Sequence, residues 1–153
     1  HLSIRRQRQM CIRDRTYTWR DLTVRAGRQP LSGPSGRLFH IKARFRGGQA
    51  RRFGLEIFGT PVSYDAARKV LQCRDRAASL EPVDGGIDLE LLIDRNSIEI
   101  FANDGRVYMP IGGILPETSG PLGLFSEEAS TRVESLSVWT LRSIWPEAGG
   151  TSR

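Results

Sequence analysis

Side chains that could perform acid–base, nucleophilic or metal chemistry are few in this sequence. It holds two histidines, His1 and His40, and two cysteines, Cys11 and Cys73. A Ser-His-Asp site needs a histidine between a nucleophile and an acid, and one usable histidine offers no credible set. A zinc site would need all four Cys and His residues from unrelated parts of the chain, so we predict no metal site and two free thiols.

No cofactor is predicted either. A phosphate-binding loop is a glycine-rich turn that leads into a helix, whereas Gly47-Gly48 fits a hairpin turn between two strands. His40 lies on the polar side of an alternating stretch beside Lys42, and we expect it to be solvated.

The positive charge is concentrated in one segment. The formal net charge is +6, and residues 1–28 hold eight arginines against Asp14 and Asp21, which accounts for all of it. Residues 29–153 are therefore neutral overall and create no large field that would attract a polyanion. We predict no nucleic-acid partner, and because no apolar run approaches the roughly 18 residues of a membrane span, no membrane partner.

Apolar and polar residues alternate along at least five separate runs. A period of two places one side of each run in a core and the other side in solvent, which is typical of β-strands. Short strands about ten residues apart, separated by turns, indicate a β-sandwich. We predict an all-β fold of two packed antiparallel sheets, jelly-roll or concanavalin-like. The runs are 38–45, 53–57, 87–93, 98–101 and 133–141.

Turn residues separate these runs. Asn103-Asp104-Gly105 combines residues that tolerate positive φ, as a tight hairpin requires. The segment 64–71 (YDAARKVL) could form a helical turn and a half or a hairpin about Asp65–Arg68. No cap or sustained helical period supports the helix, so we favour the hairpin.

Apolar residues in the first fifteen positions recur with neither the helical nor the strand period. The string RQMCIRDR (8–15) is similar to translated sequencing-adapter read-through, and the alternative is an ordinary basic tail. The sequence also lacks an initial Met and the apolar core of a secretion signal, and we interpret it as a fragment. We expect a disordered or artefactual leader at 1–15, the sandwich at 16–147 and a disordered tail at 148–153.

The run IDLELLIDRNSIEIFANDGRVYMP (87–110) resembles the C-terminal module of glycoside hydrolase family 32, which includes invertases, levanases, inulinases and other fructosidases. Stretches 38–45, 60–73, 121–127 and 133–145 also resemble that module, in the expected order. One departure is Glu127-Glu128-Ala129, where the family often has a Gly pair. The residues of the family motif, to which we assign structural roles, are Asp94, Arg95, Ser97, Glu99, Phe101, Asn103, Asp104 and Gly105.

This resemblance implies a two-domain parent enzyme, in which a β-propeller holds the active site and the sandwich follows it. The family retains anomeric configuration with two carboxyl groups that lie on propeller motifs. Two segments of this chain match those motifs only in part, namely Asn103-Asp104-Gly105 and Cys73-Arg74-Asp75-Arg76. We therefore assign no catalytic residue and expect no hydrolysis by this chain alone.

The predicted role is to support the stability of an absent β-propeller catalytic domain. The alternative is a fructan-binding or lectin-like module, with Trp139 and Trp145 as interface or sugar contacts, although packing is the commoner use of such residues. An interface is expected on the face that bears Glu99 and Phe101, because an outward Phe marks either an interface or a second core layer. Many relatives of this family act outside the cell, but nothing in the sequence indicates export.

Overall fold

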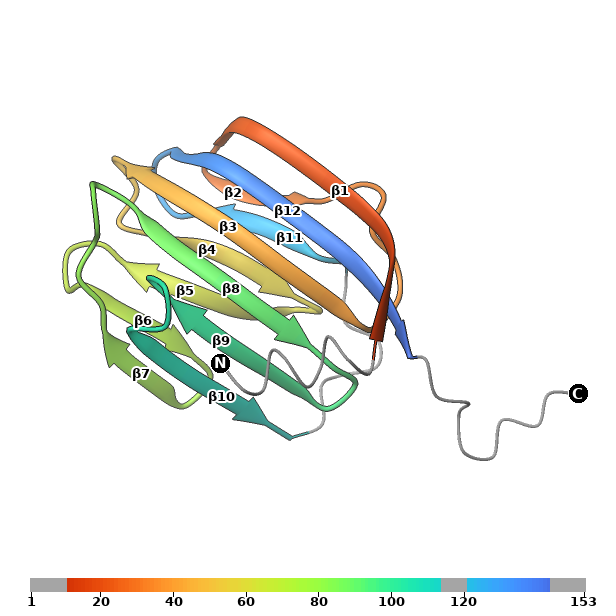
Figure 1. The fold of residues 1–153 in the computed structure, drawn as a ribbon. Coiled ribbons are helices and arrows are strands. Elements are labelled where there is room, and N and C mark those ends of the chain that lie inside the picture. Colours follow the sequence, from red (N-terminus) through yellow and green to blue (C-terminus); the bar gives the residue numbers. More distant parts are fainter. Residues whose placement is uncertain (1–10, 114–120, 144–153) are drawn as a thin grey trace, which may run out of the picture.

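The computed structural model describes residues 11–113 and 121–143, which form two antiparallel six-stranded sheets packed face to face (Figure 1). The five predicted alternating runs coincide with strands to within a residue or two, and the predicted all-β sandwich is confirmed. Sheet A runs in the spatial order β1 (Cys11–Val24), β12 (Thr131–Ser143), β3 (Phe39–Gly48), β8 (Ile87–Ile93), β9 (Ser97–Ala102) and β10 (Val107–Gly112). Sheet B runs in the order β2 (Gly27–Pro30), β11 (Gly123–Ser126), β4 (Arg52–Ile57), β5 (Thr60–Asp65), β6 (Val70–Cys73) and β7 (Arg76–Ser79).

The core lies between the two sheets. One row of side chains crosses sheet A in register through Val138, Ile41, Leu91, Ile100 and Met109, and every member is buried. Because side chains of a strand alternate, the next row of the same strands points away from the core. Sheet A therefore has an outer face, which includes Arg44, Asp88 and Phe101.

The segment 64–71 forms the predicted hairpin rather than a helix. Strands β5 and β6 pair from Val62↔Cys73 to Asp65↔Val70. The Asp65 carboxylate accepts hydrogen bonds from the backbone N–H groups of Ala67 and Arg68 at 3.0 and 2.9 Å. These bonds hold the turn closed and lower the pKa of Asp65, with the bond from Arg68 as the largest cause.

The structure contradicts the expected disorder of the leader at residues 11–15. They belong to β1 and pair with β12, for example Arg13↔Leu141 and Arg15↔Thr140, with a bulge between Arg13 and Arg15. The edge of β12 offers backbone hydrogen bonds to an extended segment. An exposed edge strand can therefore form without alternating apolar and polar side chains. Residues 1–10 and the predicted tail at 148–153 lie outside the described residues.

The described part of the chain contains no helix that could cross a membrane.

Candidate functional site

The motif residues before β9 form a reversal between β8 and β9. The backbone N–H of Asp94 donates to the Ser97 carbonyl at 2.9 Å, and the N–H of Arg95 donates to the Asp94 carboxylate at 2.6 Å. Asp94 and Arg95 are exposed, and Ser97 is half-buried. Since this carboxylate is engaged with its own turn, the contacts indicate a structural role for Asp94.

Asn103 is the best-connected member of the motif. Its side-chain oxygen accepts from the N–H of Asp88 at 2.8 Å, and its amide nitrogen donates to the carbonyl of Glu81 at 2.7 Å. The residue is 3% exposed and has φ 48°, and Asp104 and Gly105 continue the turn at φ 60° and 83°. Asn103 thus connects the β9–β10 turn to the beginning of β8 and to the loop that precedes it.

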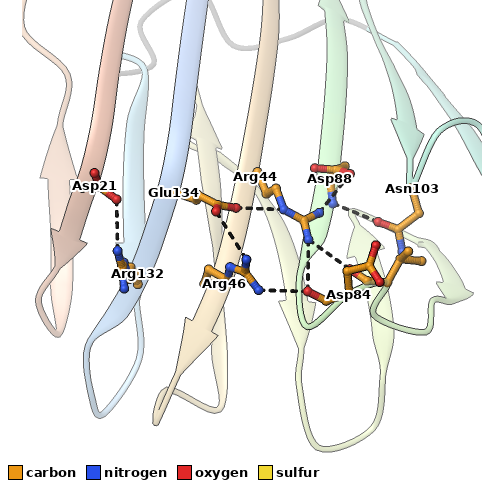
Figure 2. Close-up of polar contacts among 9 residues, drawn as sticks. Asp21, Arg44, Arg46, Asp84, Asp88, Asn103, Arg132 and Glu134 are labelled. Carbon is orange, nitrogen blue, oxygen red and sulfur yellow. Dashed lines mark hydrogen bonds and ion pairs between the residues drawn. The ribbon is translucent and has the colours of Figure 1, made fainter.

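Next to Asn103 lies a charged network on the outer face of sheet A, which sequence analysis missed (Figure 2). The Arg44 guanidinium contacts Asp88 at 3.0 Å, Glu134 at 2.9 Å and the Val83 carbonyl at 3.0 Å. The hydrogen bond with Asp88 is the largest of the contributions that raise the pKa of Arg44 above its ordinary value. The network joins β12, β3 and β8, and Arg44 lies 90 residues from its partner Glu134 in the sequence. This network could not be recognised from the sequence, because it forms only when the three strands pair.

Glycine permits the close packing of this network. A Cβ atom at Gly86 would lie 2.8 Å from a terminal nitrogen of Arg44 and 2.9 Å from the carbonyl oxygen of Phe45. The second contact is with backbone, which cannot rotate away, so a side chain at position 86 would displace the loop.

On the same face, in the outward rows beside Asp88, strands β8, β9 and β10 carry an apolar cluster separate from the main core. Leu92 and Phe101 are 2% and 5% exposed. The Phe101 ring stacks on Tyr108 with centroids 4.9 Å apart, and the Tyr108 hydroxyl donates to Glu99 at 2.8 Å. Tyr108 itself is 48% exposed. Of the two alternatives for Phe101, the burial favours a second core layer over a bare exposed ring.

Trp139 lies on this face beside a buried histidine. The Arg13 guanidinium stacks over the Trp139 ring at 4.3 Å, and the His40 ring lies 4.8 Å from it. The expectation that His40 is solvated is wrong: it is 1% exposed and 2.6 Å from the Glu90 carboxylate. The neighbouring strands carry large side chains that cover the imidazole, which alternation within one strand cannot reveal. Trp145 lies outside the described residues.

Sheet B presents a different outer face. Arg28 pairs with Glu56 at 3.2 Å and Arg52 with Glu127 at 3.6 Å. Phe125 also belongs to this face, in register with Arg28 and Gly54, and is 8% exposed. Charged pairs of this kind are typical of a solvated surface.

Two carboxyl groups that come together on sheet A, Asp88 and Glu134, both bind the guanidinium of Arg44. An open recess of about 530 Å³ is lined by Arg74, Asp75, Arg76, Ile111 and Gly112, and of these described lining residues Asp75 alone carries a carboxyl group. The described residues also contain no group of three or more His, Cys, Asp and Glu side chains placed to hold a metal ion.

Cys73 faces the core as a free thiol. It is 1% exposed, and burial raises its pKa from 9.0 to about 11. A thiol that stays protonated near neutral pH is a poor nucleophile, so we assign Cys73 to packing.

Comparison with known proteins identifies the family to which this chain is related. Residues 8–140 match the family described as "Glycosyl hydrolases family 32 C terminal". The chain is 31% identical over 160 residues to a levanase of Bacillus subtilis (strain 168), covering 88% of this chain and 23% of the levanase. A second levanase, from Bacillus sp. (strain L7), is 39% identical over 71 residues, which are 46% of this chain and 8% of that protein.

Solved structures share the fold. An exo-inulinase from Aspergillus awamori superposes with a TM-score of 0.68 at 18% identity, over 90% of this chain and 31% of the inulinase. A β-fructofuranosidase from Aspergillus kawachii superposes with a TM-score of 0.70 at 19% identity, over 88% of this chain and 29% of that enzyme. The chain therefore spans a third or less of each of these relatives.

Proposed function

This chain belongs to the C-terminal domain family of family 32 glycosyl hydrolases, and from this premise we propose that it is the non-catalytic module of a longer enzyme that cleaves β-fructosidic bonds in fructans or sucrose. The observation that carries the proposal is the family match over residues 8–140. The named relatives are levanases, an exo-inulinase and a β-fructofuranosidase, all much longer than this chain.

The placement of the acidic side chains supports a non-catalytic role. Retaining glycoside hydrolysis uses two carboxyl groups about 5–5.5 Å apart that flank the scissile bond. Here Asp88 and Glu134 are bound to Arg44, Glu90 to His40, and Glu99 to Tyr108. Because these groups already bind neighbouring side chains on a sheet surface, the reacting carboxyl pair belongs, in this proposal, to the preceding β-propeller.

The role proposed for the module is to stabilise that propeller. The coverage of the relatives leaves about three quarters of the levanase from Bacillus subtilis outside the match, enough for a complete second domain. Strand β1 pairs with β12 along its length and is the edge strand of sheet A.

Expression of the parent enzyme from the complete reading frame tests this function. We expect the parent to release fructose from levan, inulin or sucrose. A variant that ends before β1 should show a lower thermal midpoint and a shorter active half-life. An intact parent without activity on β-fructosides would contradict the proposed family of reactions. A truncated enzyme as stable as the intact one would contradict the stabilising role.

The alternative function, a fructan-binding module, would need aromatic rings free to stack on sugars. One ring contact of Trp139 is taken by Arg13 and another by His40, which disfavours this use of the residue. Retardation of the purified chain in gels that contain levan or inulin, and loss of that retardation in Trp139→Ala, would favour the alternative.

A further inference from the structure

We propose that two copies of this chain associate through the outer edge of β1 and extend sheet A across a two-fold axis at Tyr17. The partner is therefore a second copy of the same strand, paired antiparallel. This inference does not depend on the reaction of the parent enzyme, so the failure of either proposal leaves the other standing.

The outer edge of β1 is open to pairing. Strand β1 has 14 residues and lies at the edge of sheet A, and no other described strand pairs with its outer side (Figure 1). The N–H of Arg15 donates to the Thr140 hydroxyl of β12 at 3.0 Å, so the backbone groups of Arg15 point towards β12. Backbone groups alternate between the two edges of a strand, so those of Thr16, Thr18 and Arg20 point to the open edge. Such unpaired groups are a template for another strand.

Two opposite charges on this strand have no ion-pair partner among the described residues. Asp14 and Arg20 are both exposed and unpaired, whereas Asp21 binds Arg132 at 3.0 Å. In an antiparallel pair about a two-fold axis at Tyr17, Asp14 of each copy comes next to Arg20 of the other. Two ion pairs form in this way, one at each end of the ladder, and opposite charges across paired strands stabilise a sheet.

The backbone and the charges favour the same register. With the axis at Tyr17, Thr16 of one copy lies opposite Thr18 of the other, and both present their N–H and C=O groups to the open edge. Each such pair exchanges both backbone hydrogen bonds. A shift of the axis to Thr16 or to Thr18 would move Asp14 away from Arg20 and leave both charges unpaired.

A pair of aromatic rings lies on the inner side of the same edge. Tyr17 and Trp19 are half-buried against the main core and stack with centroids 6.3 Å apart and an interplanar angle of 19°. In the proposed dimer Tyr17 faces Tyr17 of the second copy in a non-hydrogen-bonded pair, where side chains approach most closely. The two copies therefore cover the exposed parts of each other's rings, and aromatic pairs across strands add to the stability.

The same features limit the assembly to two copies. The bulge between Arg13 and Arg15 and the positive φ of Asp21, 52°, interrupt the regular edge on both sides of the ladder. At the other edge of sheet A, β10 contains Pro110, which lacks the N–H that a further strand would need. A short ladder makes a small contact, so we expect a closed and reversible dimer.

Sedimentation equilibrium of the purified chain tests the dimer. We expect the mass to rise with concentration from the 17.2 kDa of one chain towards twice that value. Arg20→Asp places two like charges together at each end of the ladder and should raise the dissociation constant at least about tenfold. The exchange of both charges, Asp14→Arg with Arg20→Asp, should restore it. Both side chains are exposed, so circular dichroism should show an unchanged fold in each variant.

Arg68→Asp is the matched control. It makes the same change in charge at an exposed position in the β5–β6 turn and should leave the dissociation constant unchanged. A single mass of 17.2 kDa at every concentration from about 1 μM to about 1 mM would overturn the dimer. A dimer that Arg20→Asp does not weaken, or that the charge exchange does not restore, would overturn the register about Tyr17.

Thr18→Pro tests the backbone pairing directly. Proline removes the N–H that points to the open edge without removing a bond to β12, and proline is tolerated on edge strands. We expect this variant to keep the fold and to lose the dimer, whereas Thr18→Ala should retain it. Dimerisation of Thr18→Pro with the dissociation constant of the unmodified chain would show that the edge of β1 is not the contact.

Discussion

At the scale of single residues, Asn103 combines two structural tasks in one side chain. It forms two hydrogen bonds to backbone groups, at 2.8 and 2.7 Å, and it occupies positive φ at 48°. Asn103→Gly removes the bonds and keeps the backbone conformation accessible, and at about 1 kcal/mol for each bond we expect a loss of about 2 kcal/mol. Asn103→Ala should lose about 1 kcal/mol more, because alanine disfavours positive φ. Urea unfolding of the three proteins measures both differences, and equal stability of the Gly variant and the unmodified chain would contradict the role of the bonds.

Glu128 lies in the stretch Glu127-Glu128-Ala129, where the family that the chain resembles often has a Gly pair. It is exposed and has φ 68°, a conformation that favours glycine over residues with a Cβ. We expect Glu128→Gly to raise the free energy of unfolding by about 0.5–1 kcal/mol. Glu127→Gly is the matched control, and it should destabilise, since Glu127 does not adopt positive φ and pairs with Arg52 at 3.6 Å. The denaturant midpoints of both variants and of the unmodified chain measure these changes in stability. A Glu128→Gly protein less stable than the unmodified chain would contradict the strain at this position.

Cys73 makes the stability depend on alkaline pH. Its thiol has a pKa of about 11 in the fold against an ordinary 9.0, because burial disfavours the thiolate. Between these values the unfolded chain loses a proton that the folded chain keeps, so stability is complete below pH 9.0 and falls as the pH rises towards about 11. Burial also raises the pKa of Tyr64, which acts in the same direction at higher pH.

Between about pH 8 and about pH 10.5 we expect Cys73 to account for a loss of about 2 kcal/mol. Cys73→Ala should be less stable than the unmodified chain at the lower pH but should lose less on alkalinisation. Urea unfolding at both pH values checks this difference. Parallel losses in the two proteins would show that Cys73 does not carry the effect.

The burial of His40 could not be predicted from its own position in the sequence. Its position between Ile41 and Phe39 correctly excluded it from the main core. Its burial depends on Trp139 and Glu90, which are contributed by two other strands. A period within one strand assigns a side chain to a face, but it carries no information on what the neighbouring strands place around it.

At the scale of elements, Arg44 connects three strands of sheet A. We expect Arg44→Ala to cost about 1–2 kcal/mol, because its partners Asp88 and Glu134 and the Val83 carbonyl lose a charged donor in a partly buried position. Arg132→Ala is the control. Arg132 pairs with Asp21 at 3.0 Å, with both side chains more than 60% exposed, and such a pair contributes at most about 0.5 kcal/mol. Thermal or urea unfolding of both variants measures the contrast, and equal losses would contradict the special role of Arg44.

Elements with a strong alternating pattern were predictable from the sequence, and those without one were not. Phe39, Ile41, Ala43 and Phe45 are all buried as the period of two predicts. The beginning of β1 was missed, since Arg13 and Arg15 are exposed on an edge strand and are held by backbone pairing with β12. On the outer face of sheet A, Glu99 and Phe101 were identified from their positions in β9, but only the strand register shows that Leu92 and Tyr108 lie beside them.

At the scale of the whole molecule, the sandwich and its family were both predictable, because several ordered motifs span nearly the whole described chain. Part of the positive charge of residues 1–28 lies in the sheets themselves, because β1 and β2 carry Arg13, Arg15, Arg20 and Arg28. The apolar layer of Leu92, Phe101 and Tyr108 outside the main core forms only when β8, β9 and β10 lie side by side.

The central claim is that this chain supports a fructoside-cleaving enzyme without performing the reaction. Incubation of the purified 153-residue chain with levan, inulin and sucrose, followed by quantification of fructose, tests that claim most directly. We expect no fructose above the rate of the protein-free control, while the parent enzyme, assayed beside it, hydrolyses at least one of the three. Fructose release by the chain alone, abolished by Asp75→Asn, would contradict the account and assign the reaction to this sandwich.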